Sequence, residues 1–191
     1  GTPAAFGYNP NLKPYPYDPD RARALLAEAG YADGFDLTFE VVTGSFPADS
    51  EIYQQVASDL GKVGINVNLK QIAFPEWLKK FLANEWDGAG FGLSWNSSPY
   101  MDSVRPFGYQ TCAKRNPHFC DESMSPLFAQ VNAEFDPEKR KQLLWQLHAM
   151  AQDVAPAIFL VEQIDVTGIA KNVQGFEFVN RLVLYPKISI Q

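Results

Sequence analysis

The sequence is poor in the residues and motifs that most enzymes use for catalysis. Its 191 residues include two histidines, His118 and His148, and no G-x-S-x-G, H-E-x-x-H, Walker or G-x-G-x-x-G motif. His148 lies in an apolar stretch beside Trp145, a setting typical of a structural histidine. A hydrolase needs a nucleophile and a base held close together, and the sequence offers no such pair. We therefore expect neither enzymatic activity nor a cofactor.

Positive charge and long apolar runs are also scarce. The net charge is −6 and no run of basic residues is present, which disfavours nucleic acid and anionic membranes as partners. No apolar run approaches the roughly 20 residues needed to span a bilayer, so direct membrane insertion is not expected. The opening Gly1-Thr2-Pro3 matches neither a start site nor a signal peptide. We expect the chain to be a fragment of a longer protein.

Cysteine is limited to two residues, Cys112 and Cys120. A disulfide between them would close a nine-residue loop, contribute roughly 2.5 kcal/mol on the chain-entropy model, and indicate an oxidising compartment. Free thiols are one alternative. A metal site is another, because His118 and Asp121 lie beside the cysteines, although the spacing matches no zinc pattern. We favour the disulfide and expect no metal.

Apolar residues (46%) and aromatic residues (14%) are abundant enough for a folded core, and we expect residues 1–191 to form a single domain. Two stretches, YDPDRARALLAEAGY and FDPEKRKQLLWQLHA, share a helix-start pattern. In each, an Asp caps the first turn, Pro follows, and a second acid suits the positive end of the helix dipole. The first helix should run from Pro19 to Gly30 and the second from Pro137 to about Asp153.

Strands and helices alternate between these two helices. FDLTFEVVTG (35–44) and INVNLKQIAF (65–74) have strand periodicity, and an amphipathic helix lies between them, with Asp49 or Ser50 as its cap and Gly64 as its stop. This order predicts a parallel pair joined by a right-handed crossover. The sequence thus predicts an α/β fold with a mixed, mainly parallel sheet flanked by helices.

Three further segments extend this pattern. A short helix at 75–85 should place Trp77, Leu78, Phe81 and Leu82 on one side. A third strand at 86–95 has Gly88, Gly90 and Gly92 on one face, which indicates close approach by a covering helix or by a ligand. The segment 156–169 begins as a wholly apolar run, as an interior strand would, and the tail after it reads as further strand. The long helix should bury Leu143, Leu144, Leu147 and Met150.

The loop SWNSSPYMDSVRPFGY (94–109) is the segment most suited to binding. It follows the third strand at its carboxyl end, where open α/β sheets place ligand sites. It combines flat aromatic side chains with hydrogen-bonding and charged ones, as small-molecule pockets do. The candidate ligand-binding residues are Trp95, Asn96, Ser98, Tyr100, Asp102 and Arg105. The alternative is a surface loop packed by its own aromatic side chains.

Five stretches in collinear order, spanning nearly the whole chain, carry a family resemblance. They are YDPDRARALLAEAGYADGFDLTFEVVTG, VASDLGKVGINVNLKQIAFPEWLKKF, WDGAGFGLSWNSSPYMD, FDPEKRKQLLWQLHAMAQDVAPAIFL and VQGF. Together they resemble the carboxyl-terminal half of the dipeptide/oligopeptide/nickel class of extracytoplasmic solute-binding proteins of ABC importers. Both Asp-Pro helix starts belong to that pattern, so the two helices are not a duplication.

The resemblance implies one lobe of a two-lobed, periplasmic-binding-protein-like fold that closes on a ligand and delivers it to an ABC permease. It implies a periplasmic location and an amino-terminal lobe that this chain lacks. In peptide-binding members, an acid shortly after the tryptophan that matches Trp95 pairs with the ligand's amino group. Here that position is Ser98, and the nearest acid is Asp102, the candidate charge partner. A sugar, an opine, a small amide or a metal complex are further ligands to consider.

A different class of function is an interaction module that docks another protein through exposed aromatic side chains. A large apolar surface patch would favour the interaction module, and a polar half-cleft would favour the receptor lobe.

Overall fold

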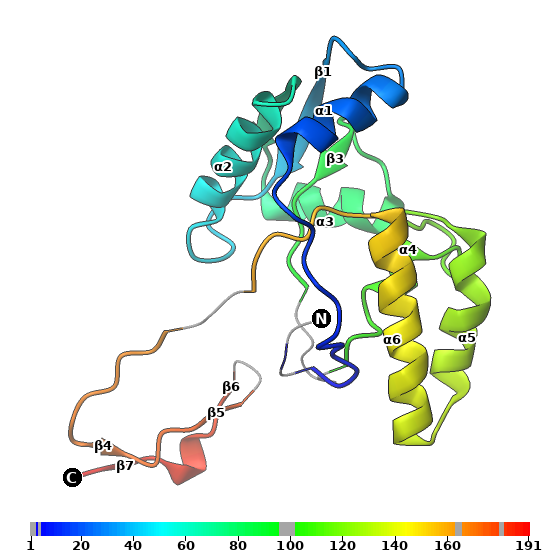
Figure 1. Ribbon diagram of the computed structural model, residues 1–191. Coiled ribbons are helices and arrows are strands. Elements are labelled where there is room, and N and C mark those ends of the chain that lie inside the picture. The colour runs from blue at the N-terminus through cyan, green and yellow to red at the C-terminus, as the bar shows by residue number, and fades with distance from the viewer. Residues whose placement is uncertain (1–2, 4, 96–101, 163–165, 180–181) are drawn as a thin grey trace. The chain divides into compact units, whose positions relative to one another are not determined.

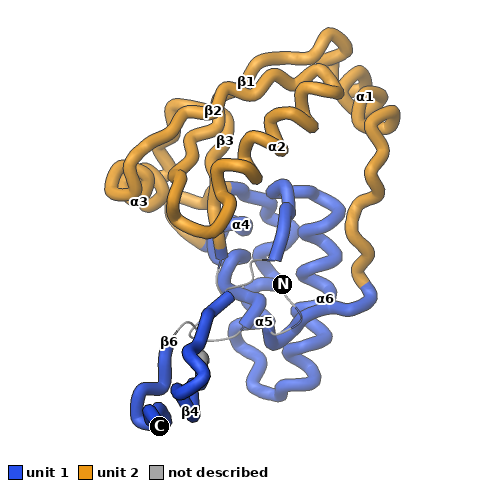
Figure 2. The backbone as a smooth tube through the Cα atoms, turned by 90° about the vertical axis from the view of Figure 1, so that its left-hand side faces the viewer, with its two compact units in different colours: residues 1–11, 95–113, 119–191 blue, residues 12–94, 114–118 orange. Residues whose placement is uncertain are grey.

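The computed structural model describes residues 3, 5–95, 102–162, 166–179 and 182–191 (Figure 1). The chain divides into two compact units (Figure 2). Unit 1 comprises residues 1–11, 95–113 and 119–191, and unit 2 comprises residues 12–94 and 114–118. That both units belong to one ligand-binding lobe spanning 1–191 stays a prediction.

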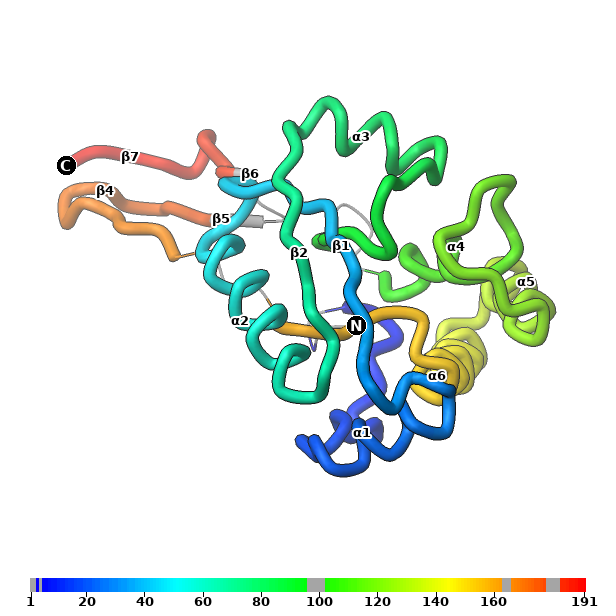
Figure 3. Tube along the Cα trace, turned by 90° about the horizontal axis from the view of Figure 1, so that it is seen from above, coloured from blue at the N-terminus to red at the C-terminus, as the bar shows by residue number. Residues whose placement is uncertain are grey.

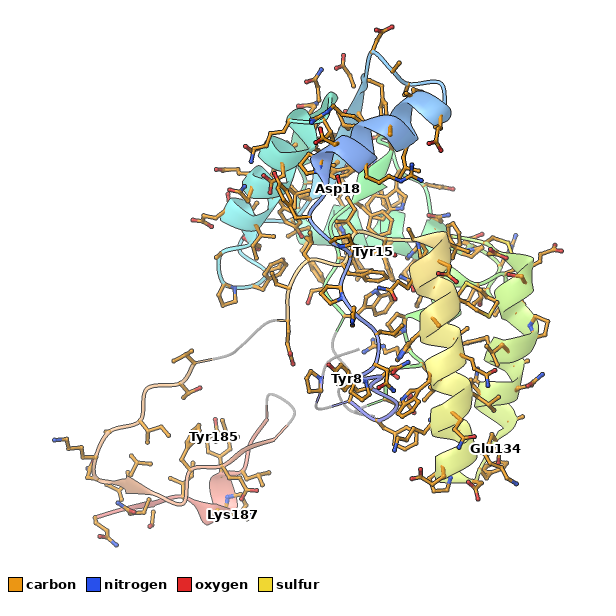
Figure 4. All side chains as sticks on the ribbon, in the orientation of Figure 1. Tyr8, Tyr15, Asp18, Glu134, Tyr185 and Lys187 are labelled. Carbon is orange, nitrogen blue, oxygen red and sulfur yellow. A yellow bond between two sulfur atoms is a disulfide. The ribbon has the colours of Figure 1, made fainter. Side chains whose placement is uncertain are left out.

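Both Asp-Pro segments begin helices by the expected mechanism. In α1 (Pro19–Glu28), the Asp18 carboxylate accepts a hydrogen bond from the Arg21 N–H at 2.8 Å (Figure 4). In α6 (Pro137–Val154), Asp136 accepts from the N–H groups of Glu138 and Lys139 at 3.1 and 2.9 Å. Each cap satisfies backbone donors that the first helical turn leaves unpaired. The two helix starts are therefore confirmed.

A three-stranded parallel sheet forms the centre of unit 2. The strands are β1 (Phe35–Val41), β2 (Ile65–Gln71) and β3 (Gly90–Phe91), in the order β2-β1-β3. Figure 3 shows β1 and β2 side by side, with α2 (Asp49–Gly61) connecting them. Their register pairs Phe35 with Ile65 and Val41 with Gln71. The predicted parallel pair and the α/β class are confirmed.

The start of α2 differs from the prediction. Asp49 is not the residue that caps the helix but its first residue, and Ala48 precedes it with a left-handed backbone. The buried Asp49 carboxylate instead accepts hydrogen bonds from the N–H groups of Gly44, Ser45 and Phe46 at 2.7–3.3 Å. The acid thus organises the loop before the helix, because that loop has donors that face it.

β3 is much shorter than the strand predicted at 86–95. The Asp87 N–H donates to the buried Glu40 side chain at 2.9 Å, so it is not available to extend the strand ladder. The glycines allow close packing here. A Cβ on Gly88 would lie 2.3 Å from the Thr38 carbonyl oxygen, and one on Gly92 would lie 2.3 Å from the Tyr53 hydroxyl of α2. Close packing of the helix α2 therefore explains why position 92 is glycine. Of the two predicted explanations, a covering helix or a ligand, the helix applies to Gly92.

Only half of the apolar side chains predicted to lie together on α3 (Phe74–Ala83) are buried. Trp77 and Phe81 are buried, and their rings lie within 6.5 Å of Phe91, measured between centroids. Leu78 and Leu82 are 40% and 63% exposed. Each follows its buried neighbour by one residue, which turns it about 100° around the helix and away from that contact. Of the four side chains predicted on one side of this helix, Trp77 and Phe81 are therefore the buried ones.

The core of unit 1 lies between α4 (Phe107–Gln110), a 3-10 turn at Glu122–Met124, α5 (Ser125–Ala133) and α6. Its fully buried side chains are Met124, Val131, Leu144 and Leu147. Leu143 and Met150 are only partly buried against this core. The predicted stripe on the long helix is thus confirmed for Leu144 and Leu147.

The apolar run after α6 is not an interior strand. Among the described residues of 156–169 no strand forms, and the four side chains of 158–161 are 46–64% exposed. Apolar composition predicts burial but does not supply a partner strand, and none of the described strands pairs with this run. The prediction of an interior strand was wrong.

The tail does contain the strands expected of it. β4 (Val173–Gln174) pairs antiparallel with β7 (Ser189–Ile190), and β5 (Phe178–Val179) pairs antiparallel with β6 (Leu182–Val183). A 3-10 turn at Tyr185–Lys187 lies between β6 and β7 (Figure 4). Across the described ranges, none of the helices is both long and apolar enough to cross a bilayer.

Candidate functional site

The loop that follows β3 in the chain brings together two of the predicted ligand-binding residues. The Trp95 and Tyr109 rings lie 5.3 Å apart, measured between centroids, with their planes inclined by 39°. The Arg105 guanidinium carbon lies 5.7 Å from the centre of the Trp95 ring. Trp95 is half-buried and Arg105 is exposed. The predicted residues Asn96, Ser98 and Tyr100 lie outside the described residues.

A short helix fixes the carboxyl end of this loop. Pro106 precedes α4, and Phe107, the first residue of α4, is buried in the unit 1 core. The Phe107 carbonyl accepts a hydrogen bond from the buried Thr111 hydroxyl at 2.9 Å. Tyr109 therefore lies in a short helix that is anchored at its first residue and at the residue that follows its last.

The third described candidate, Asp102, is engaged inside unit 1. One oxygen of its carboxylate pairs with Arg140 Nη1 at 2.6 Å, and the other accepts a hydrogen bond from the Val104 N–H at 2.9 Å. Arg140 also donates from Nε to the Val131 carbonyl at 3.0 Å. Asp102 forms an isolated β-bridge with Phe6, which ties the amino-terminal segment to the loop. A role of Asp102 as the charge partner of a ligand stays a prediction.

His148 has the surroundings of a structural residue. It is buried beside the Phe107 ring, at 5.4 Å between centroids, and burial lowers its pKa to about 4. Its Nε2 has no hydrogen-bond partner among the described residues. A histidine that is neutral and enclosed in a core cannot exchange protons readily with a substrate.

His118 is structural as well. The centroid of its ring lies 4.5 Å from that of the Phe81 ring and 4.9 Å from that of the Phe91 ring. Its Nε2 lies 3.2 Å from the Phe81 carbonyl oxygen. Burial lowers the pKa of His118 below its ordinary value. Each histidine is therefore part of the side-chain packing of its own unit.

The predicted disulfide is confirmed. Cys112 and Cys120 are bonded to each other, and their Cα atoms lie 4.6 Å apart. Both sulfur atoms are consumed by this bond, which removes them as thiolate metal ligands. No group of three or more His, Cys, Asp or Glu residues suited to a metal ion occurs in the described ranges.

An ion cluster on the polar face of the unit 2 sheet was not predicted from the sequence. Glu40, fully buried, pairs with Lys70 at 3.0 Å and with Lys80 at 3.1 Å. Both lysines also contact Asp87, at 2.7 and 2.8 Å. These contacts lower the pKa of Asp87 to about 2. The signal available in the sequence was the parallel register, which places Glu40 opposite Lys70.

A shallow groove of about 660 Å³ lies on the same sheet face. Its polar side chains pair across the strands: Asn66 donates to Asp36 at 2.8 Å and Asn68 to Thr38 at 3.5 Å. A groove whose polar groups already satisfy one another offers few convergent contacts to a ligand. The loop around Trp95 therefore remains the candidate site.

Comparison with known proteins supplies the family. Residues 1–115 match the family described as bacterial extracellular solute-binding proteins, family 5 Middle. The chain is 28% identical over 181 residues to "Di/tripeptide-binding protein 2" of Pseudomonas aeruginosa (strain UCBPP-PA14). That match covers 91% of this chain and 34% of the relative, so the chain spans about a third of the relative's length.

Solved structures share the fold. The structure of HbpA2 from Haemophilus parasuis superposes with a TM-score of 0.80 at 24% identity, covering 98% of this chain and 38% of that one. A dipeptide binding protein from Pseudoalteromonas sp. SM9913 in complex with Met-Leu gives 0.74 at 20% identity, covering 100% of this chain and 39% of that one. With more than half of its residues matched and a shared fold, the chain belongs to family 5 of the bacterial extracellular solute-binding proteins.

Proposed function

We propose that this chain is the carboxyl-terminal ligand-binding lobe of an ABC-transporter receptor. The receptor captures a peptide or another small solute in the periplasm and delivers it to the permease in the cytoplasmic membrane. Support comes from the family match and from a relative named for binding di- and tripeptides. The family is a solute-binding class, which fits a protein that binds its ligand without chemical turnover.

The single observation that carries the ligand site is the cluster of Trp95, Arg105 and Tyr109. Half-buried aromatic rings supply contact area at a low entropic cost, and a guanidinium beside them supplies charge and direction. In the chain, Trp95 comes after β3, and segments that follow a strand of an open α/β sheet commonly supply ligand-binding residues. Asn96, Ser98 and Tyr100 complete the proposed wall.

The remaining sequence of the receptor is the proposed partner of residues 158–161. Four consecutive apolar side chains at about half exposure lose free energy in water, roughly 25 cal/mol for each Å² that could be buried. An amino-terminal lobe that covers this run would recover that free energy and complete the ligand cleft.

The same exposed run favours the second candidate, an interaction module that docks another protein. Hydrogen exchange of the full-length receptor separates the two. If the chain is a receptor lobe, the backbone of 158–161 should be protected from hydrogen exchange in the isolated full-length protein. If the chain is an interaction module, the same backbone should stay unprotected until a second protein is added.

Ligand-induced stabilisation tests the proposed function directly. Thermal unfolding of the full-length receptor is followed with a panel of dipeptides, sugars and opines, for the wild type and for a variant carrying Trp95→Ala and Asp102→Ala. We expect at least one panel member to raise the unfolding temperature of the wild type but not of the variant. Equal responses of the two proteins would count against the site, and a silent panel would count against the function.

A further inference from the structure

We infer that the Cys112–Cys120 disulfide is a redox-sensitive closure, which holds Pro117 and His118 against the carboxyl-terminal end of α3. We refer to these two residues as the α3 cap. Reduction of the disulfide releases the cap and loosens that end of the helix. The inference goes beyond the proposed function, and its test needs no ligand.

The carboxyl-terminal end of α3 has carbonyl groups that need partners from outside the helix. The last four carbonyls of an α-helix have no N–H donor within it. His118 Nε2 lies 3.2 Å from one of them, the Phe81 carbonyl oxygen. Because a carbonyl oxygen only accepts, Nε2 is the donor of this hydrogen bond. A residue 37 positions further along the chain thus satisfies a backbone group of α3.

Asn84 joins the other residue of the cap to α3. It follows the last residue of α3 with a left-handed backbone, at a φ of 54°. Its Nδ2 donates to the Pro117 carbonyl at 2.8 Å, and its Oδ1 accepts from Trp86 Nε1 at 3.2 Å. One side chain at the end of the helix therefore connects the cap to the Trp86 indole.

The His118 ring also packs α3 against β3. It meets Phe81 of α3 and Phe91 of β3 edge-on, with centroid distances of 4.5 and 4.9 Å. Each of these rings stacks on a tryptophan: Phe81 on Trp77 at 4.9 Å, and Phe91 on Trp86 at 4.0 Å. Edge-to-face contacts of this kind add stability beyond the apolar area that they bury. Loss of the cap therefore weakens the contact between the helix and the strand.

The disulfide is the strongest closure of the loop that carries the cap. It joins the two ends of the segment 113–119 covalently. At the same ends, the Phe119 N–H donates to the Tyr109 carbonyl at 3.2 Å. The Ala113 N–H donates to Thr111 Oγ at 3.4 Å. These distances lie at and beyond the long end of the usual range. Covalent closure restricts the loop, so less conformational entropy is lost when the cap docks.

A dithiol reductant opens this closure by exchange. One thiolate of the reductant attacks a cysteine sulfur and forms a mixed disulfide, and its second thiolate then displaces that sulfur. The S–S bond of the protein breaks and the reductant leaves as its own disulfide. The protein gains two electrons and two protons, and Cys112 and Cys120 become thiols. The loop then keeps only its hydrogen bonds, and the cap leaves α3 more often.

Hydrogen exchange of the full-length receptor tests the inference. The oxidised wild type is compared with wild type treated with dithiothreitol and with a variant carrying Cys112→Ser and Cys120→Ser. The reporters are the amides of Asn84 and Glu85, which donate to the Lys80 carbonyl at the end of α3. We expect loss of the disulfide to speed their exchange about tenfold or more.

The carboxyl-terminal end of α2 is the matched control in the same unit. The Val63 N–H donates to the Leu60 carbonyl and the Gly64 N–H to the Gly61 carbonyl, both at 3.1 Å. We expect exchange at Val63 and Gly64 to change by less than about threefold. Equal acceleration at both helix ends would overturn the inference, since the disulfide would then stabilise the whole unit and not the cap.

His118→Ala tests whether the disulfide acts through the cap. With the disulfide intact, this variant should exchange rapidly at Asn84 and Glu85, and the two serine substitutions should then add less than about threefold. His118→Phe, which keeps a ring but lacks the Nε2 donor, should show the same pattern to a smaller degree. Arg115→Ala, which removes an exposed side chain from the same loop, should exchange like the wild type.

Three results would overturn the inference. The first is unchanged exchange at Asn84 and Glu85 when the disulfide is lost. The second is a disulfide effect as large in the His118 variants as in the wild type. The third is an effect of dithiothreitol that the two serine substitutions do not reproduce, because it would then come from another bond. None of these results bears on whether the receptor binds a peptide, so the proposed function is tested separately.

Discussion

Replacing Glu40 by glutamine should destabilise unit 2 more than any change on the exposed part of the same strand. Glu40 is fully buried, and its carboxylate pairs with Lys70 and Lys80 and accepts the Asp87 N–H. Breaking a buried ion pair costs about 3–5 kcal/mol. Glutamine retains an oxygen that can accept from Asp87, and Asp87 still contacts both lysines, so we expect the low end, about 3 kcal/mol.

The same carboxylate makes stability depend on pH in acid. Burial by itself raises the pKa of Glu40, but the hydrogen bonds from Lys70, the Asp87 N–H and Lys80 outweigh it, so the pKa lies below its ordinary value of 4.5. The ionised form is therefore favoured by folding. Its contribution is fully present above about pH 4.5 and is lost as the pH falls through the lowered pKa of the folded state.

Urea unfolding between pH 7 and pH 3 measures both effects. Asp36→Asn is the matched control, because Asp36 lies on the same strand face, is exposed, and accepts a hydrogen bond from Asn66. We expect the control to change the free energy of unfolding at pH 7 by less than about 0.5 kcal/mol and to keep the wild-type pH profile. The reasoning is refuted if Glu40→Gln unfolds like the control, or if it loses as much stability as the wild type below pH 4.5.

Three further predictions concern other parts of the chain. Reduction of the disulfide, or Cys112→Ser, should lower the free energy of unfolding by about 2.5 kcal/mol, measured in urea with and without reductant; an unchanged midpoint would contradict this. Gly88→Ala should cost about 2 kcal/mol or more, since its Cβ would lie 2.3 Å from a backbone oxygen of Thr38, whereas Gly168→Ala, with nothing within 4 Å, should be nearly neutral by the same assay. Burial lowers the pKa of His148 from 6.5 to about 4, so on acidification the unfolded chain binds a proton here before the folded chain does. The free energy of unfolding should therefore fall as the pH drops from 6.5 to 4. His148→Gln should remove this slope, and a slope that survives in the variant would refute the assignment of the slope to His148.

Features governed by local chemistry could be predicted from the sequence. Asp18 and Asp136 cap their helices because a short acid before proline faces the unpaired N–H groups of the first turn whatever lies beyond it. The parallel pair followed from a strand, a helix and a strand with short joints. The disulfide followed from two cysteines with seven residues between them. The groups that form the caps and the disulfide lie close together in the chain, and the two strands, 30 residues apart, are joined by a helix with short connections.

Features that depend on distant residues could not be predicted. The sequence identified Asp102 as the acid nearest Trp95, but its partner Arg140 lies 38 residues further along the chain. The apolar run at 158–161 indicated burial without indicating what would cover it. Glu40 is polar on a strand, which indicates exposure until Lys80 is brought over it from α3.

The affinity of Trp95→Ala for a ligand that binds the wild type tests the central claim most directly. The ligand is taken from the panel, and calorimetric titration of the full-length receptor is compared with that of Tyr17→Ala, which removes an exposed aromatic side chain from unit 2. We predict that Trp95→Ala weakens binding about tenfold or more while Tyr17→Ala binds like the wild type. Wild-type affinity in Trp95→Ala would contradict the assignment of this loop as the ligand wall.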